Sequence, residues 1–156
     1  MRIGVIGSRL LDDALLIDRC VQRLAARHGD ALVIVSRGQR GTGRLVEAAA
    51  RRFCKAPPEI VSVPWEEART WMEEGREPTR AFVKSIDQLV VIFDAEDDGR
   101  GRDVLFAAKC TRGNRKPLFL YDVQKKAWIT DAVEQWKICE EQFPSTQWWH
   151  HDRLHR

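Results

Sequence analysis

Glycine and arginine recur together in three short segments of the sequence, and this combination suits the binding of phosphate. The segments are 7–9, 36–43 and 94–102. Glycine lets backbone N–H groups approach an anion closely, and a guanidinium group pairs with two phosphate oxygens at once. We therefore expect a ligand phosphate to contact residues of these segments, namely Gly7, Ser8, Arg9, Arg37, Gly38, Arg40, Gly41, Thr42, Asp94, Gly99, Arg100, Gly101 and Arg102.

Each segment follows a short apolar run that is typical of a buried parallel strand. Five such runs alternate with stretches of helical periodicity, at 3–7, 31–35, 59–63, 89–93 and 117–121. Parallel neighbours need long crossover connections, and each helix must bury one apolar side. The sequence therefore predicts an α/β fold with a doubly wound parallel sheet, five strands in the order 3-2-1-4-5 and helices on both faces.

In such a sheet the ligand site lies beyond the carboxyl ends of the strands, at the point where the strand order reverses. That point falls between the first and fourth strands, so we expect the three segments to meet there. The competing interpretation is that the glycines only permit tight turns and that the arginines are solvated. Neither G-x-G-x-x-G nor G-x-x-x-x-G-K-[ST] occurs, so the sequence does not support a standard dinucleotide site or a P-loop.

The length, composition and charge of the chain indicate a single globular domain and exclude several other classes of protein. A chain of 156 residues is the size of one domain, and 44% hydrophobic with 31% charged residues is typical of a globular core. A net charge of +3 is too small for a general binder of nucleic-acid backbones. Neither a membrane-spanning run nor a signal-peptide pattern is found, so we expect a cytoplasmic protein without membrane contact. The four cysteines lie too far apart to indicate a zinc site.

Three other features each admit two interpretations. Trp65 either stacks on a base at the edge of the site or packs in the core with Trp71. The acidic run 96–98 either holds a divalent metal that bridges the ligand phosphate or is a solvated loop; no cofactor is otherwise required. The pair Trp148 and Trp149 is costly to leave in water, which indicates docking on the same domain or on a second subunit. We prefer the second subunit and expect a homodimer.

The segments IGVIGSR (3–9), VSRGQRGT (35–42), DQLVVIF (87–93) and RKPL (115–118) resemble the SLOG superfamily over residues 1–122. Within it the small branch related to YspA and YpsA is most similar, and the DprA and LOG proteins are more distant. The resemblance implies a Rossmann-like sheet that binds a nucleotide or nucleotide-derived ligand, often as a sensor rather than a catalyst. We accordingly assign 1–125 to this domain and 126–156 to a C-terminal helix and tail.

The resemblance implies roles for individual residues. It places Gly7, Ser8 and Arg9 at the ligand, and it places Gly38, Arg40 and Gly41 around a phosphate or ribose. Residues 99–101 match the last loop of the family. Arg37 stands where the family has glycine, which predicts a less close backbone approach. Arg102 stands where serine or threonine is expected, and its charge favours a ligand with more phosphate.

Catalysis is the second hypothesis. The LOG-type phosphoribohydrolases carry an arginine where this chain has Pro78 and a glutamate in a loop where it offers only Asp103. In nucleoside deoxyribosyltransferases, which share a similar sheet, the nucleophilic glutamate falls near Leu105. Binding is thus the first hypothesis. One alternative is an N-glycosidic hydrolase or ribosyltransferase that uses Asp103 or Glu47 as its carboxylate. The other is a single-stranded nucleic-acid-binding module of DprA type. The small net charge argues against nucleic acid as a partner.

Overall fold

A six-stranded, mostly parallel sheet forms the centre of the computed structural model, which describes residues 1–62, 76–97 and 102–142. The order is β3-β2-β1-β4-β5-β6. The first five strands pair in parallel, and β6 is antiparallel to β5. The strands are β1 (Arg2–Gly7), β2 (Val33–Ser36), β3 (Glu59–Ile60), β4 (Gln88–Phe93), β5 (Leu118–Asp122) and β6 (Ala127–Ile129). The predicted five-strand order is confirmed, with one strand added at its edge.

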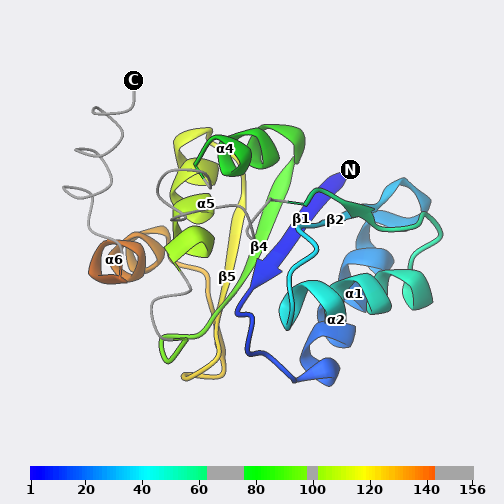
Figure 1. The fold of residues 1–156 in the computed structure, drawn as a ribbon, viewed down its shortest axis with the longest axis horizontal. Coiled ribbons are helices and arrows are strands. Elements are labelled where there is room, and N and C mark those ends of the chain that lie inside the picture. The colour runs from blue at the N-terminus through cyan, green and yellow to red at the C-terminus, as the bar shows by residue number, and fades with distance from the viewer. Residues whose placement is uncertain (63–75, 98–101, 143–156) are drawn as a thin grey trace.

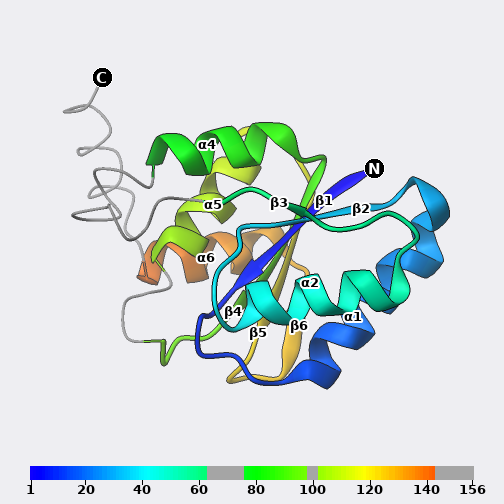
Figure 2. The same cartoon turned by 45° about the vertical axis from the view of Figure 1, so that its right-hand side comes forward.

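Helices cover both faces of the sheet, as the sequence predicts (Figures 1 and 2). One face carries α1 (Ala14–His28), which continues into the short 3-10 helix η1 (Gly29–Ala31), and α2 (Thr42–Phe53). The other carries α4 (Arg76–Ser85), α5 (Arg102–Gly113) and α6 (Ala132–Gln142). The helix expected after Pro64 lies outside the described residues. None of the described helices has the length and apolar character needed to cross a membrane.

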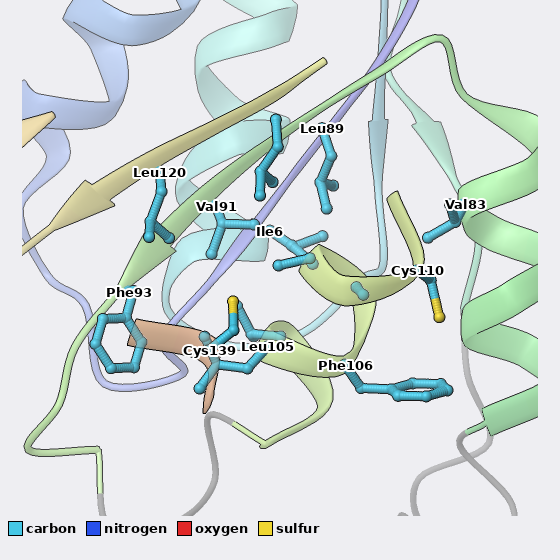
Figure 3. Packing of buried hydrophobic residues seen from close by; sticks show 14 of the residues in the cluster. Ile6, Val83, Leu89, Val91, Phe93, Leu105, Phe106, Cys110, Leu120 and Cys139 are labelled. Atoms are coloured by element: carbon cyan, nitrogen blue, oxygen red, sulfur yellow. The ribbon is translucent and has the colours of Figure 1, made fainter. Parts of the chain in front are cut away.

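Alternating residues of the strands supply two separate cores. Leu89, Val91 and Phe93 of β4 pack on the α5 side, together with Leu105, and Figure 3 shows this cluster. The residues between them, such as Val90, pack on the α1 and α2 side. Gly4 is where α4 comes closest, because a Cβ atom there would lie 2.8 Å from the ring of Phe82. Both faces of β1 and β4 are therefore buried, which explains why these strands have continuous apolar sequences.

The sixth strand lies within 126–156, where the sequence predicts only a helix and a tail. Three residues are too few for a strand pattern to be visible in the sequence. The strand forms because the Asp122 carboxylate accepts hydrogen bonds from the amides of Gln124 (3.0 Å) and Lys125 (3.2 Å), which closes the turn after β5. The Trp128 ring then packs edge-on against Tyr121, with 5.2 Å between ring centroids.

The side chain of Lys116, about thirty residues further along the chain, caps the C-terminal end of α4. Its ammonium group donates to the carbonyl oxygens of Val83 (2.8 Å), Lys84 (3.2 Å) and Ile86 (2.7 Å). These carbonyls lie at the end of the helix, where intrahelical donors are lacking and the helix dipole favours a cation. Lys116 thus fastens the start of β5 to the end of α4.

We expect Lys116→Met to lower the free energy of unfolding by about 2 kcal/mol, because hydrogen bonds to a charged group contribute about 1.5–3 kcal/mol. Urea denaturation monitored by circular dichroism measures the change. Lys125→Met removes the same charge from an exposed turn and serves as the control. A Lys116→Met midpoint equal to that of the control would contradict this role.

Two buried thiols make the fold sensitive to alkaline pH. Burial raises the pKa of Cys20 and of Cys139 to about 11. A thiol whose pKa is higher in the folded state stabilises the fold below its unfolded pKa of 9.0, and this contribution is lost as pH rises towards 11. We expect a loss on the order of 1 kcal/mol per thiol by pH 10.

The measurement is urea denaturation at a series of pH values from 8 to 11, roughly the window of thiol titration. We expect the double variant Cys20→Ala/Cys139→Ala to be less stable than the wild type at every pH, because the substitutions leave cavities. Its free energy of unfolding should nevertheless fall less steeply as the pH rises through this window. Parallel pH profiles for the wild type and the double variant would show that these thiols do not contribute.

Candidate functional site

Ser8 joins the loop after β1 to the start of α2. Its carbonyl oxygen accepts hydrogen bonds from the amide (3.0 Å) and the hydroxyl (2.9 Å) of Thr42. Its own amide donates to the carbonyl of Ile92 in β4 (3.1 Å). The helix has no side-chain cap at Gly41. The first helical amide is therefore satisfied by the neighbouring loop.

The hydroxyl of Ser8 reaches the third loop. It donates to the Asp97 carboxylate at 2.7 Å, and the amide of Arg9 donates to the same oxygen at 3.3 Å. Asp97 is held by a turn that Asp94 begins: the Asp97 amide donates to the Asp94 carbonyl (3.1 Å), and the Asp94 carboxylate accepts from the amide of Glu96 (3.0 Å). Ser8 and Asp97 are each 3% exposed. The loops after β1 and β4 are thus tied by a buried contact.

Glycine at position 41 is required by the chain itself. Gly41 has φ 65° and ψ −117°, a conformation that side chains with a Cβ atom strongly disfavour. A Cβ atom there would lie 2.4 Å from the carbonyl oxygen of Arg9 and 2.6 Å from that of Ser8. The absence of a side chain at Gly41 therefore permits a close approach to the backbone of the loop after β1.

A second serine occupies the end of β2. The Ser36 hydroxyl donates to the Glu47 carboxylate at 3.2 Å and accepts from the amide of Gly38 at 3.1 Å. Ser36 is fully buried, and Glu47 is 7% exposed. Gly38 turns the chain with φ 71°. The candidate carboxylate Glu47 therefore lies directly beneath the second loop, already in contact with a hydroxyl group.

The arginines of the predicted site divide into two sets. The Arg37 side chain is 3% exposed, and its guanidinium lies over the ring of Phe82, 5.3 Å from the centroid. Arg40 and Arg44 are exposed, and Arg9 is half-buried. Arg37 thus packs towards α4, while the other arginines lie at the surface around the start of α2.

Several predicted residues lie outside the described part of the chain. These are Trp65, Gly99, Arg100, Gly101 and the paired tryptophans Trp148 and Trp149; Arg102 and Asp103 begin α5, but their side chains are not described. Gly7 and Thr42 are buried, and the amide and hydroxyl of Thr42 both donate to Ser8, so the contact of these two residues with a phosphate stays a prediction. Among the described residues no group of His, Cys, Asp or Glu could hold a metal ion.

Asp97 is the residue that sequence reasoning missed. The acidic run 96–98 predicts either a metal ligand or a solvated loop, but Asp97 is an internal anchor whose Oδ1 atom is buried without a hydrogen-bond partner among the described residues. The spacing of Asp94 and Asp97 was the available signal, because an aspartate that begins a turn reverses the chain three residues later. That reversal returns the chain from β4 towards β1.

No protein-family model matches the sequence, and no curated protein matches it. Among solved structures, the chain is similar to DNA processing protein A (DprA) from Helicobacter pylori, which was studied for its single-stranded DNA binding mode. The TM-score is 0.53 at 13% identity, over 78% of this chain and 65% of that one. The likeness concerns the fold, which is Rossmann-like, and the match spans about two thirds of the length of the H. pylori chain.

We expect Gly41→Ala to lower the free energy of unfolding by at least about 2 kcal/mol, because alanine is strained in this backbone conformation and its Cβ atom would meet the backbone of Ser8 and Arg9. Thermal and urea denaturation measure the loss. Gly113→Ala is the matched control, since a Cβ atom there meets nothing within 4 Å and alanine favours the helix. The control should be neutral or gain up to about 1 kcal/mol. Equal stability of the two variants would show that the loops are not packed as described.

Proposed function

We propose that this chain binds a nucleotide or nucleotide-derived ligand at the carboxyl ends of β1, β2 and β4. The observation that supports this most is the junction at Ser8, which holds three loops together where the strand order reverses. Ligands of open α/β sheets bind at this position. The junction also places the backbone of Arg9 against that of Gly41, so that the segments of Arg9 and Arg40 are adjacent.

The charges around the start of α2 suit a phosphate group. Thr42 donates to Ser8 and Leu45 donates to Gly41, so the amides of Gly43 and Arg44 are the donors between them for which helix geometry supplies no acceptor. The positive end of the helix dipole lies at the same place. The exposed side chains of Arg40 and Arg44 add two guanidinium groups. We assign the phosphate of the ligand to this surface.

Two buried carboxylates beneath the loops suit a sugar. Asp97 and Glu47 each accept a hydroxyl hydrogen bond from a serine at the end of a strand. A carboxylate has capacity for several hydrogen bonds, and ribose hydroxyls are donors of the same kind as serine. A nucleotide bound with its phosphate at the arginines and its ribose towards these carboxylates would use both features.

A single-stranded nucleic acid is the second candidate. The fold likeness to DNA processing protein A favours it, since that protein was studied for single-stranded DNA binding. Arg9, Arg40 and Arg44 would then contact successive backbone phosphates. The net charge of +3 gives this candidate little general attraction for a polyanion.

Isothermal titration with AMP, ADP-ribose, NAD and cyclic dinucleotides tests the first candidate. We expect at least one of these ligands to bind, and we expect Arg40→Ala to weaken that binding by about 1.5–3 kcal/mol, the size of a hydrogen bond to a charged group. Arg51→Ala removes an exposed arginine from the other end of α2 and serves as the control. Absence of binding to every ligand would reject the proposal, and an affinity unchanged by Arg40→Ala would remove this residue from the site.

The two candidates differ in their response to salt. A short oligonucleotide releases several counterions when it binds, so its affinity falls steeply as salt is raised, whereas a mononucleotide contacts fewer charges. Titrating both ligands at a series of salt concentrations therefore decides between them. Tight, strongly salt-dependent oligonucleotide binding without mononucleotide binding would favour the second candidate.

A further inference from the structure

A second concave surface lies near the amino ends of β4 and β5, away from the strand ends that form the candidate site. We call it the basal groove. It has a volume of about 240 Å³. One side of α1 forms its wall, and residues of β4, β5 and β6 form its floor. Gln88 begins β4 and His28 ends α1, so the groove lies at the end of the sheet opposite to the candidate site. The two sites share no residue among those described.

The groove exists because the sheet is wider than the helices on this face. The core on this side is made by α1 and α2 with β1, β2 and β4, whereas β5 and β6 contribute only partly buried side chains such as Tyr121 and Trp128. The other helices lie on the opposite face (Figures 1 and 2). Phe119 is left 37% exposed. Aromatic surface is therefore open to a ligand beside α1.

The wall of the groove carries positive charge. Its residues Cys20, Arg23, Leu24, Arg27 and His28 recur at helical spacing on one side of α1. Arg23 and Arg27 are one turn apart, and neither has an ion-pair partner within the described part of the chain. No carboxylate is among the described residues that line the groove. Two like charges at this spacing repel each other, and an anion between them removes the repulsion.

Helix-end electrostatics account for only part of this arrangement. Arg27 and His28 lie in the last turn of α1, where cations offset the helix dipole. Arg23 lies before that turn and still faces the aromatic floor. The exposed guanidinium groups of Arg23 and Arg27 therefore favour an anionic occupant over a purely apolar one.

The floor is largely aromatic and apolar. Phe119 and Trp128 line it, and Trp128 is held in place by its edge-on contact with Tyr121. Aromatic surfaces of this kind stack on planar rings. A volume of about 240 Å³ is below the range of roughly 300–1,000 Å³ that is typical of sites for drug-sized ligands, so the groove suits a small ligand with one or two fused rings and an acid group.

We propose that the basal groove binds a small organic anion that carries a flat ring. The acid group, a phosphate, carboxylate or sulfonate, lies between Arg23 and Arg27, and the ring lies on Phe119 and Trp128. This site is independent of the proposed nucleotide site, because its residues belong to α1, to the amino ends of β4 and β5, and to β6.

The test uses 1-anilinonaphthalene-8-sulfonate, a fluorescent anion whose flat naphthalene ring carries the acid group, and its uncharged analogue N-phenyl-1-naphthylamine. We expect the sulfonate to bind saturably to one site per chain. Arg23→Gln with Arg27→Gln should weaken it at least tenfold while leaving the affinity of the uncharged analogue unchanged. The control, Arg19→Gln with Arg51→Gln, removes two exposed arginines outside the groove and should change the affinity for the sulfonate less than twofold. Equal effects of the two double variants, or no saturable binding, would overturn the proposal.

A floor variant and competition complete the test. Phe119→Ala alters an exposed part of the floor and should weaken both probes, since it removes ring contact without changing charge. AMP and 2-naphthoate distinguish a phosphate source from a carboxylate source, and displacement of the sulfonate by either supports the site. Arg40→Ala should not affect this displacement, which separates the groove from the nucleotide site. A self-associated chain that excludes the probe, detected by sedimentation, would overturn the proposal in favour of a groove closed by a second copy.

Discussion

The arrangement of the candidate site depends on the need to satisfy the buried polar groups of Ser8. Its amide, carbonyl and hydroxyl lie where three loops converge, away from water, and an unpaired group there would cost free energy. Each finds a partner on a different element: Ile92 in β4, Thr42 in α2 and Asp97 in the loop after β4. A single residue thereby fixes the relative positions of the loops.

This junction divides the candidate site into an inner and an outer layer. The inner layer consists of Gly7, Ser8, Thr42 and Asp97, which are buried and bonded to one another or packed against the chain. The outer layer consists of Arg9, Arg40 and Arg44 at the surface. Glycines that by sequence pattern suit a phosphate also serve the close approach of two loops. A glycine-rich loop therefore does not by itself distinguish between these uses.

The two faces of the sheet differ in how completely they are covered. Three helices pack on the face that holds the α5 core, and Lys116 and Lys109 fasten them: Lys116 by capping α4, and Lys109 by pairing with Glu140 of α6 at 3.0 Å. Among the described helices, α1 and α2 alone pack on the other face, although β6 widens the sheet. The open strip over β5 and β6 is the structural origin of the basal groove. The short edge strand β6 contributes Trp128 to this surface.

The sequence by itself determined the α/β class, the five parallel strands and their order, because continuous apolar runs separated by helical periods leave few other ways to bury both faces. It also identified the loops that meet at the reversal of strand order. It could not determine which arginines are exposed: Arg37 and Arg40 belong to one loop, and only the packing of Phe82 under Arg37 separates them. Nor could it show that Asp97 is buried against Ser8 or that β6 forms, since burial of a carboxylate and the pairing of a three-residue strand depend on partners distant in the chain. Contacts of this kind are decided by the tertiary structure, because the physical partner of each group is supplied by an element that the local sequence does not contain.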